Sequence, residues 1–301
     1  MTQSKERFKA KLKIGLGGDM GKRGRATLRA QWLGHLLRDL REANGLTLKD
    51  AAEYLQRDLS MISRFETGVY PIRRGDVMAL IDLYGVEEAR QREILLHLAT
   101  EVWQKGWWDK YSGQVDGSLI DLVWLESRAE YIGAYSIFPV TSLLQIRAYA
   151  TALIRAADPD APVESVERWV ELRMSRQRIL DGSVQLDVVL DEAALRRSVG
   201  GSEVMNAQIR HILTAAERPN VDIRVLPFTV GAHASPDGGF RLIKMADPFP
   251  KVAHVEGPGG SLYVESAEAE RLAARYDRLR ESALDPDDSI GFITALGKEL
   301  A

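Results

Sequence analysis

The chain has 301 residues, of which 45% are hydrophobic and 28% are charged, and its formal net charge is −3. This composition is typical of a globular protein, and the length fits one large core or two domains. The chain contains no cysteine, which excludes disulfides, zinc sites built from thiolates and a cysteine nucleophile. No apolar run approaches the roughly 18 residues of a membrane-spanning helix and no hydrophobic signal segment follows the basic N-terminus, so we expect a cytoplasmic protein.

The charge is unevenly distributed along the chain. Residues 1–75 hold 16 Lys and Arg against 8 Asp and Glu, a net charge of +8, whereas the remaining residues carry −11. A basic N-terminal part is where a polyanion such as DNA would bind. The glycines within residues 1–28 match neither nucleotide-binding glycine pattern in their spacing, so we interpret this stretch as a flexible basic arm. A tail that is only solvated is the alternative.

Four short helices separated by tight turns are predicted between residues 29 and 86. The first carries leucines at helical spacing and ends at an Asn–Gly pair. Thr47 is the predicted N-cap of the second helix, with Asp50 as its capping-box partner. Asp58 is the predicted N-cap of the third helix, which ends at Gly68. The inward-facing residues of the first and fourth helices are Leu33, Leu36, Leu37, Leu40, Val77, Leu80, Ile81 and Tyr84.

The second and third helices have the sequence pattern of a helix-turn-helix, a motif that presents one helix to the major groove of DNA. Such a pair needs a small residue where the helices cross and apolar residues that hold the two helices at a fixed angle. The residues in these structural positions are Ala52, Leu55, Ile62 and Phe65. The same spacing leaves Leu59, Ser60, Ser63 and Arg64 facing outward. Arg64 is long enough to form two hydrogen bonds with a guanine.

The stretch TLKDAAEYLQRDLSMISRFETG resembles the XRE, or lambda-repressor-like, family of helix-turn-helix transcriptional regulators. The positions that carry the resemblance are Ile62, Ser63, Glu66 and Gly68. The resemblance implies that Glu66 ties the recognition helix to its neighbours. The DNA base contacts that it implies fall on Leu59, Ser60 and Arg64, and the phosphate contacts near Lys49, Thr67 and Arg73. We also expect Ser63 to contact bases and Arg57 and Arg74 to contact phosphates. The chain has Gln56 where the family usually has a glycine in the turn, so we expect some strain there.

Residues 87–117 are predicted to connect two domains. A charged helix is expected at 87–105, and the aromatic stretch WQKGWWDKY occupies residues 103–111. These aromatic side chains could form a ligand platform or a packing hinge between the domains. We favour the packing hinge, because aromatic residues more often supply buried area and no polar partners lie nearby in the sequence.

Residues 118–301 are predicted to form a larger, mixed α+β domain. Helices are expected at about 118–130, 142–157, 163–181, 202–217 and 266–284. Short strands are expected in VQLDVVLD, VDIRVLPF, GGFRLIKM, KVAHVEG and SLYVE. Turn signals such as SPDGG and GPGG join three of these strands, which favours a small, mostly antiparallel sheet.

Several segments of this domain resemble the C-terminal domain of actinobacterial XRE-type regulators that are called antitoxin-like. Among them are SLLQIRAYATALIRA at 142–156 and PNVDIRVLPFTVGAHASPDGGFRLI at 219–243. The resemblance covers nearly everything from about residue 118 onward. It implies no established chemistry, but it implies a very small partner protein that is encoded beside the regulator and bound by this domain. Thr141 and Ser142 stand where the family usually has Pro-Gly.

Two polar groups in this domain have both a functional and a structural interpretation. Asp191 and Glu192 could be a general acid–base pair, but an aspartate that ends a strand and caps the next helix explains them without catalysis. Arg173, Arg176 and Arg178 could cradle an anion. A helix face that is solvated or paired with acids is the commoner arrangement, and we favour it here.

The histidines do not form a metal-binding pattern. They are His35, His97, His211, His233 and His254, and they lie far apart in the sequence. His233 lies on a glycine-rich hairpin, where a residue that lines the turn is favoured over a ligand. No nucleophile motif of a hydrolase is present either, so we expect no metal, no cofactor and no enzyme activity.

The sequence therefore predicts an α+β protein with an N-terminal all-α helix-turn-helix domain of four to five helices. The predicted parts are a basic arm (1–28), a DNA-binding domain (29–86), a connecting segment (87–117) and a regulatory domain (118–301). We expect a transcriptional regulator that binds double-stranded DNA as a homodimer and whose C-terminal domain binds a small protein or ligand. The alternative is an antitoxin-like module that sequesters a small partner protein and regulates its own operon.

Overall fold

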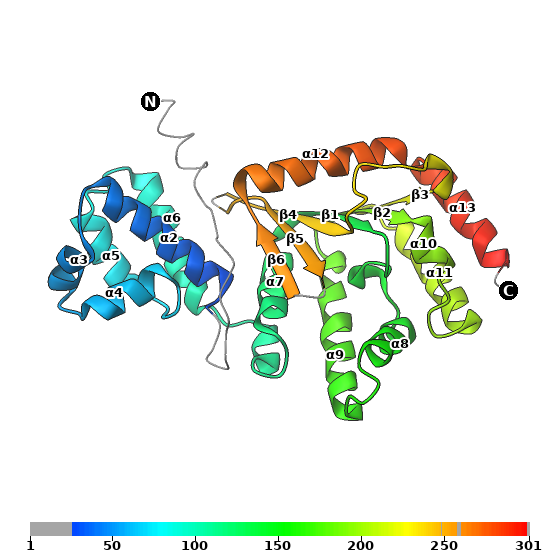
Figure 1. The fold of residues 1–301 in the computed structure, drawn as a ribbon, viewed down its shortest axis with the longest axis horizontal. Helices are drawn as coiled ribbons and strands as arrows, with labels where there is room; N and C mark the ends of the chain where they lie inside the picture. The colour runs from blue at the N-terminus through cyan, green and yellow to red at the C-terminus, as the bar shows by residue number, and fades with distance from the viewer. Residues whose placement is uncertain (1–25, 248, 258–259, 300–301) are drawn as a thin grey trace. The chain divides into compact units, whose positions relative to one another are not determined.

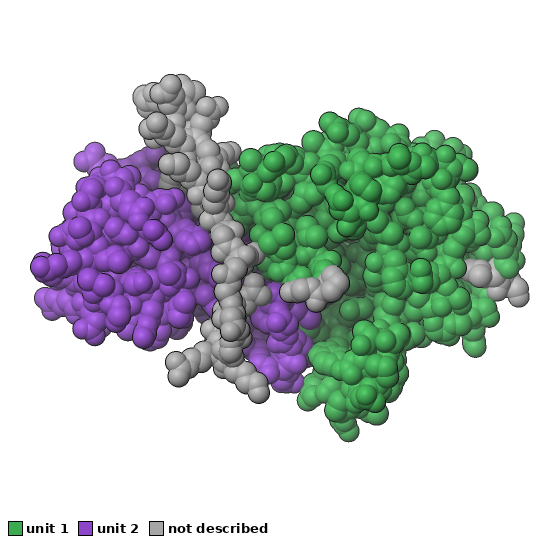
Figure 2. Space-filling model, in the orientation of Figure 1, with its two compact units in different colours: residues 1–14, 122–301 green, residues 15–121 purple. Residues whose placement is uncertain are grey.

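The computed structural model describes residues 26–247, 249–257 and 260–299. They form two compact units, an N-terminal unit that ends at Asp121 and a C-terminal unit that begins at Leu122 (Figures 1 and 2). The predicted basic arm lies outside the described residues, apart from its last three positions. Within the described ranges, no helix has the length and apolar character needed to cross a membrane.

The N-terminal unit is built from helices. They are α2 (Leu28–Ala43), α3 (Leu48–Leu55), α4 (Leu59–Glu66), α5 (Arg74–Leu83), α6 (Ala89–Trp103) and the 3-10 helix η1 (Trp107–Tyr111). Helix α4 packs against α2 and α3, and α6 packs against α2 and α5. Because α6 contributes buried Leu95, Leu98 and Ala99, the helix expected to connect two domains is part of this core. Helix α7 (Gly117–Ser127) continues the chain into the C-terminal unit.

The helices of this unit begin and end at the predicted cap and stop residues. The Thr47 hydroxyl accepts the Asp50 N–H at 3.2 Å and the Asp50 carboxylate accepts the Thr47 N–H at 2.6 Å, which is the predicted capping box. Asp58 is the N-cap of α4, although its side chain makes no capping hydrogen bond. Gly45 and Gly68 follow α2 and α4 with φ angles of 69° and 70°. Glycine adopts this left-handed region without strain, so it ends a helix readily.

The predicted apolar stripes face the core of the unit. The stripe residues that are buried are Leu33, Leu37, Val77, Leu80, Ile81 and Tyr84. Leu36 and Leu40 are half-buried, at the edge of the same stripe. Helical periodicity alone was therefore sufficient to identify the core face of α2 and α5.

The C-terminal unit is built on one six-stranded sheet. Its strands are β1 (Ala129–Ser136), β2 (Gln185–Asp191), β3 (Val221–Leu226), β4 (Phe240–Met245), β5 (Val252–Gly257) and β6 (Gly260–Val264). They lie in the order β3-β2-β1-β4-β5-β6. The pairs β1–β2 and β2–β3 are parallel, and the pairs β1–β4, β4–β5 and β5–β6 are antiparallel. The predicted α+β class is confirmed, and most strand pairs are antiparallel as predicted, while two parallel pairs make the sheet mixed.

Helices cover both faces of this sheet (Figure 1). They are α8 (Arg147–Ala157), α9 (Val163–Arg176), α10 (Glu192–Arg196), α11 (Ser202–Ala216), α12 (Ser266–Ser282) and α13 (Pro286–Glu299). Three short 3-10 helices are η2 (Ser142–Leu144), η3 (Gln177–Asp181) and η4 (Phe228–Val230). One core joins the sheet to α11 and α13 and includes Leu186, Val188, Ile209 and Ile293. A second core joins the other face to α12 and includes Tyr135, Phe240, Tyr276 and Leu279.

Strand β1 was not predicted, and it forms one of the two parallel pairs that make the sheet mixed. The helix expected to run to residue 130 ends at Ser127, and β1 follows at once. Its central residue is Gly133, where a Cβ would lie 2.9 Å from the Tyr131 hydroxyl and 3.0 Å from the Tyr276 ring. A glycine contributes nothing to a hydrophobic pattern. Because β1 joins β2 through α8 and α9, the pair is parallel, as such crossovers require.

Two other helix predictions need correction, and one helix was missed. The helix expected at 142–157 is divided into η2 and α8, with Gln145 and Ile146 between them. The Gln145 side-chain amide donates to the Val140 carbonyl at 2.5 Å. The Gln145 backbone carbonyl accepts from the Gln177 side-chain amide at 2.7 Å, so it is engaged outside a helix. The helix expected at 163–181 continues as η3 after residue 176. Helix α13 was not predicted.

Candidate nucleic-acid interface

The candidate interface is built on α3, α4 and the short turn between them. Gln56, which follows α3, has φ 52° and ψ 47°, in the left-handed region. The Arg57 N–H donates to the Ala52 carbonyl at 3.0 Å and closes the end of α3. A residue with a side chain costs about 1–2 kcal/mol in this conformation. The turn therefore contains the strain expected where the chain lacks the usual glycine.

One face of α4 is buried within the N-terminal unit. Ile62 is 0% exposed and Phe65 is 4% exposed, while Ala52 of α3 is buried and Leu55 is half-buried. Burial of an apolar side chain of this size stabilises a fold by about 1.5–3 kcal/mol. The two large side chains of α4 thus hold it against α2 and α3, in the positions that the sequence pattern indicates.

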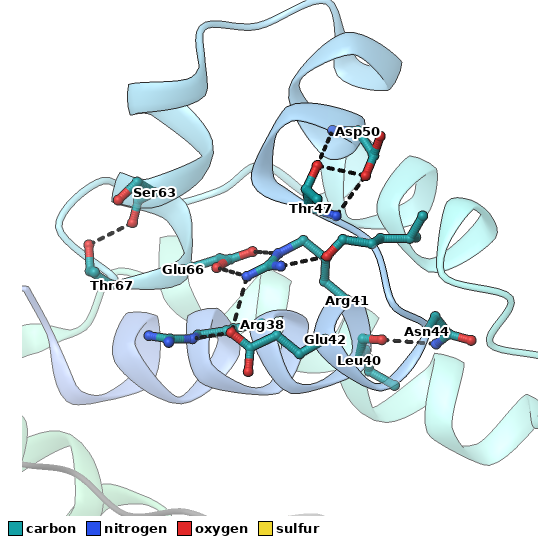
Figure 3. A network of polar contacts seen from close by, with 11 residues as sticks. Arg38, Leu40, Arg41, Glu42, Asn44, Thr47, Asp50, Ser63, Glu66 and Thr67 are labelled. Atoms are coloured by element: carbon teal, nitrogen blue, oxygen red, sulfur yellow. Dashed lines mark hydrogen bonds and ion pairs between the residues drawn. The ribbon is translucent and has the colours of Figure 1, made fainter.

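A buried ion pair fixes the C-terminal end of α4 (Figure 3). Arg41 of α2 donates through Nε and Nη2 to the two carboxylate oxygens of Glu66, at 2.6 and 2.9 Å. Both side chains are 7% exposed. Nη1 of Arg41 also donates to the Leu46 carbonyl at 2.7 Å, so one guanidinium holds both α4 and the turn after α2. The hydrogen bond to Glu66 is the main cause of a raised pKa at Arg41.

The partner of Glu66 could not be identified from the sequence. Arg41 and Glu66 are 25 residues apart, and the pattern identifies Glu66 alone. An arginine in the last turn of α2 is equally explained as a solvent-exposed residue that favours a helix C-terminus. Only the packing of α2 against α4 brings the two side chains together.

A close approach of backbone segments accompanies this ion pair. A Cβ on Gly34 of α2 would lie 2.4 Å from the Phe65 carbonyl oxygen and 2.6 Å from that of Glu66. A Cβ on Gly68 would lie 2.6 Å from the backbone nitrogen of Gln31. Backbone atoms cannot rotate away from such contacts as a side chain can. Both positions therefore require glycine, and Gly34 was not singled out from the sequence.

The opposite face of α4 carries the residues predicted to contact bases. Leu59 is 51% exposed, Ser60 and Arg64 are exposed, and Ser63 is half-buried. Among the described residues, no carboxylate forms an ion pair with Arg64. Tyr70, which follows α4 and was not predicted, is 49% exposed and lies 6.0 Å from the Phe65 ring. The outer face of α4 thus combines long and short side chains, while the other face of the helix is fixed.

The residues predicted to contact phosphates differ in how strongly they interact with other residues of the chain. Lys49 lies 3.6 Å from the Glu53 carboxylate and Arg57 lies 3.8 Å from that of Asp76. Exposed pairs of this kind are weak, so a phosphate can compete for either cation. Thr67 is more committed, because its hydroxyl and its N–H both donate to a carbonyl one turn earlier in α4, at 2.9 and 3.0 Å.

Arg73 and Arg74 are exposed at the start of α5. The Arg73 guanidinium lies over the Trp103 ring, 5.3 Å from its centroid. Trp103 Nε1 donates to the Ile72 carbonyl at 2.8 Å, so α6 holds the loop that carries Arg73. This contact holds Arg73 in place while leaving it exposed at the start of α5.

The aromatic stretch after α6 is used for packing. Trp108 is 5% exposed and Tyr111 is 4% exposed. Trp107 packs edge-on against both rings, with centroids 5.9 and 6.3 Å away. These contacts show that residues of this stretch pack against one another, while its role as a hinge between domains stays a prediction.

The polar groups of the C-terminal unit that suggested catalysis have structural partners. The Asp191 carboxylate accepts the N–H two residues on, at 2.9 Å, and so caps α10 as predicted. Glu192 is engaged by the Phe228 N–H at 2.8 Å. His233 accepts the Ser235 N–H at 3.3 Å and so lines its turn. Across the described part of the chain, no group of three or more His, Asp or Glu side chains could hold a metal ion.

Comparison with protein families gives a match in each unit. Residues 32–94 match a helix-turn-helix domain, a range that begins in α2 and reaches into α6. Residues 119–295, more than half of the chain, match a domain of unknown function, DUF5753. No match to the chain was found among curated proteins or among solved structures. A helix-turn-helix domain indicates DNA binding and transcriptional regulation.

Proposed function

We propose that this chain, which belongs to the protein family defined by the domain of unknown function DUF5753, is a sequence-specific, DNA-binding transcriptional regulator of the XRE type and not an enzyme. The observation that carries the proposal is the division of α4 into two faces. Its inner face is fixed by Ile62, Phe65 and the Glu66 ion pair, while its outer face leaves Ser60 and Arg64 exposed. A rigid helix with a short, polar outer face is what insertion into a major groove requires.

We propose further that the protein reads DNA as a homodimer, with two half-sites about one helical turn apart. One short helix reads few bases, and two-fold pairing doubles the sequence that is read. The C-terminal unit, with its large sheet, supplies the surface for pairing and for a small protein or ligand that changes DNA affinity. Footprinting should reveal a palindromic site, and sedimentation should detect a dimer at binding concentrations. A single asymmetric half-site bound by a monomer would contradict this proposal.

The test of DNA reading separates base contacts from phosphate contacts. Arg64→Ala should weaken binding to the selected site by about 1–3 kcal/mol and relax the preference at one base pair. Arg73→Ala and Arg74→Ala should weaken binding to all sequences alike and reduce the slope of log K against log salt by about one each. Selection from a random DNA library, followed by binding titrations at several salt concentrations, measures both effects.

A matched control is Arg178→Ala, which removes an exposed arginine from the C-terminal unit and should change neither quantity. If Arg64→Ala kept the full sequence preference, α4 would not be the recognition helix. If no DNA sequence were enriched by the intact protein, the proposal of sequence-specific binding would fail as a whole.

A second candidate function, sequestration of a small partner protein, is favoured by one feature of the sheet. The edge of β3 is covered, because Val225 donates to Ser289 Oγ and accepts from the Leu284 N–H, both at 2.9 Å. At the other edge, within the described residues, β6 pairs only with β5. An open edge strand can pair with a strand of another chain.

Titration of a small protein encoded beside this gene, with and without DNA, separates the two functions. If the partner modulates DNA binding, the coupling is reciprocal: a tenfold loss of DNA affinity, about 1.4 kcal/mol, must appear as a tenfold loss of partner affinity when DNA is present. A partner that binds tightly with no effect on DNA affinity would favour sequestration.

A further inference from the structure

Three arginines lie together inside the C-terminal unit, on elements far apart in the sequence. Arg176 of α9 and Arg241 of β4 both donate to the Ser142 hydroxyl oxygen, at 3.1 and 3.4 Å. Arg173, one turn before Arg176 on α9, donates to Gln145 Oε1 at 2.8 Å. We call these three arginines, with Ser142 and His254, the arginine cluster. Of the arginines considered in RMSRQR, Arg178 alone is exposed.

The arginine cluster contains more positive than negative charge. Arg176 is paired, because it donates to both Glu126 carboxylate oxygens at 2.8 and 2.7 Å, and the two side chains are 4% and 1% exposed. The carboxylate nearest to Arg241 is that of Glu256, which is 3.9 Å away and 69% exposed, so it lies largely in water. The hydrogen-bond partner of Arg173 is a neutral amide. Within the described residues, Arg173 and Arg241 thus form no ion pair with a buried carboxylate, although Glu126, which is bound by Arg176, also attracts Arg241.

The environment of Arg173 reflects this excess of charge. Burial, followed by repulsion from Arg176, lowers the pKa of Arg173 to about 10. Repulsion by Arg241 acts in the same direction, and Glu256 opposes it. An arginine does not lose its proton at physiological pH even so. The neighbouring guanidiniums therefore stay charged and repel one another, and a bound anion would remove this repulsion.

His254 of β5 supplies a second, independent indication of a missing acceptor. It is 1% exposed, and its Nδ1 lies 3.2 Å from Arg241 Nη1. Because a guanidinium can only donate, Nδ1 must be the acceptor, and the neutral ring then carries its proton on Nε2. That Nε2 is buried and has no hydrogen-bond partner within the described residues. A buried N–H donor without an acceptor costs about as much as a lost hydrogen bond.

Within the described part of the chain, the hydroxyl groups of Ser142 and of its neighbour Thr141 also lack an acceptor. Ser142 Oγ already accepts from two arginines, so its own proton needs a further acceptor. Thr141, the preceding residue, is 2% exposed, and its hydroxyl has no partner among the described residues. Guanidiniums, an imidazole N–H and hydroxyls are all donors. Their unmet partner is therefore an acceptor that also carries negative charge.

We propose that the arginine cluster binds the phosphate or carboxylate group of a small molecule, with Arg173 and Arg241 as its charged donors. The side chain of Arg241 is 16% exposed and His254 is 1% exposed, so these donors are largely shielded from water and suit a small oxyanion rather than a nucleic-acid backbone. Arg176 positions the site through Glu126 and Ser142. The proposal names the chemical class of the small ligand in the proposed function, and to that extent it rests on the proposed function. It does not depend on DNA binding by α4.

The test uses the full chain without DNA and follows thermal unfolding by calorimetry. Inorganic phosphate, succinate and sodium chloride are compared at equal ionic strength. At about four times its Kd, a bound anion should raise the Tm of the C-terminal transition by on the order of 2–4 °C over sodium chloride. The larger rise, with phosphate or with succinate, identifies which of the two oxyanions the site takes.

Arg173→Gln and Arg241→Gln should lose this rise, and Arg178→Gln, which changes an exposed arginine of the same segment, should keep it. Arg173→Gln without anion should unfold at the same temperature as the parent or higher, because it removes repulsion. If Arg241→Gln fails to fold, Arg173→Gln alone decides. A parent protein that is indifferent to both anions, or an equal rise in Arg173→Gln, would overturn the proposal. A Tm that falls in Arg173→Gln without anion would show a structural role and overturn it too.

Discussion

The two units each contain a buried arginine–glutamate pair, and the pairs differ in their surroundings. In the N-terminal unit, Arg41 and Glu66 are both 7% exposed, and the remaining Nη1 of Arg41 reaches a backbone carbonyl. In the C-terminal unit, Arg176 and Glu126 are as deeply buried, but two further arginines lie beside them. The first pair is complete, whereas the second belongs to a cluster with unmet donors.

This difference separates two uses of buried charge. A complete pair has no capacity for a further ligand, so what it contributes is geometry: it holds the end of α4 against α2. A cluster with excess donors is unfavourable until an acceptor arrives, so it contributes a site. The N-terminal unit accordingly presents its chemistry on an exposed helix face, while the C-terminal unit keeps part of its chemistry inside.

The largest expected effect comes from breaking the complete pair. Glu66→Ala leaves Arg41 buried without its carboxylate and should destabilise the N-terminal unit by about 3–5 kcal/mol. Hydrogen exchange of the α2–α4 amides measures the loss as a lower opening free energy. Glu53→Ala, which removes the exposed partner of Lys49, should leave these amides nearly unchanged.

A double variant tests whether the pair acts through its charge. Replacing Arg41 and Glu66 together by methionine removes both buried charges and should recover most of the stability that Glu66→Ala loses. DNA affinity should recover less, because the hydrogen bonds that fix the end of α4 are gone. Full recovery of both would mean that packing alone orients α4.

A smaller effect is expected on acidification of the C-terminal unit. Burial, then the positive charges of Arg241 and Arg176, lower the pKa of His254 to about 3. The Tyr263 ring packs against His254, with ring centroids 4.9 Å apart. In the unfolded chain the histidine pKa is near 6.5, so between pH 6.5 and pH 3 the unfolded state binds the extra proton. Stability is therefore complete above pH 6.5 and decreases as the pH falls.

The expected loss from His254 is about 2 kcal/mol at pH 5, from the linkage between the two pKa values. Urea unfolding of the C-terminal unit at pH 7.5 and pH 5, in chloride buffers, measures it. His254→Asn should reduce the difference between the two pH values by that amount. An unchanged pH dependence in His254→Asn would show that the ring is not held neutral beside Arg241.

The sequence predicted whatever depends on local periodicity and caps. The stripes of α2 and α5, the capping box at Thr47 and five of the six strands are of this kind. It did not predict β1, whose central glycine interrupts the pattern, or the mixed sheet that follows from it. The arginine cluster is a third kind of feature. Arg173 and Arg241 are on different elements, and no sequence spacing predicts that they lie in the same cluster.

The smallest effect is expected from a substitution in the turn between α3 and α4, which leaves the ion pair that fixes α4 intact. Gln56 lies in the left-handed region, where a glycine is free of the clash between Cβ and backbone. Gln56→Gly should stabilise the N-terminal unit by about 1 kcal/mol, after the greater freedom of glycine in the unfolded chain is subtracted. Gly68→Ala, at a position that requires glycine, should have the opposite sign.

The DNA affinity of this variant shows whether the ion pair or the turn sets the orientation of α4. If Arg41 and Glu66 set it, relief of strain at Gln56 should raise stability and leave the affinity for the selected site within about twofold, since the end of α4 is held elsewhere. If the turn sets it, the glycine should loosen the recognition helix and weaken binding. Hydrogen exchange and DNA titration on the same variant therefore decide whether the strained turn is only a cost or also a constraint that positions the base-contacting face.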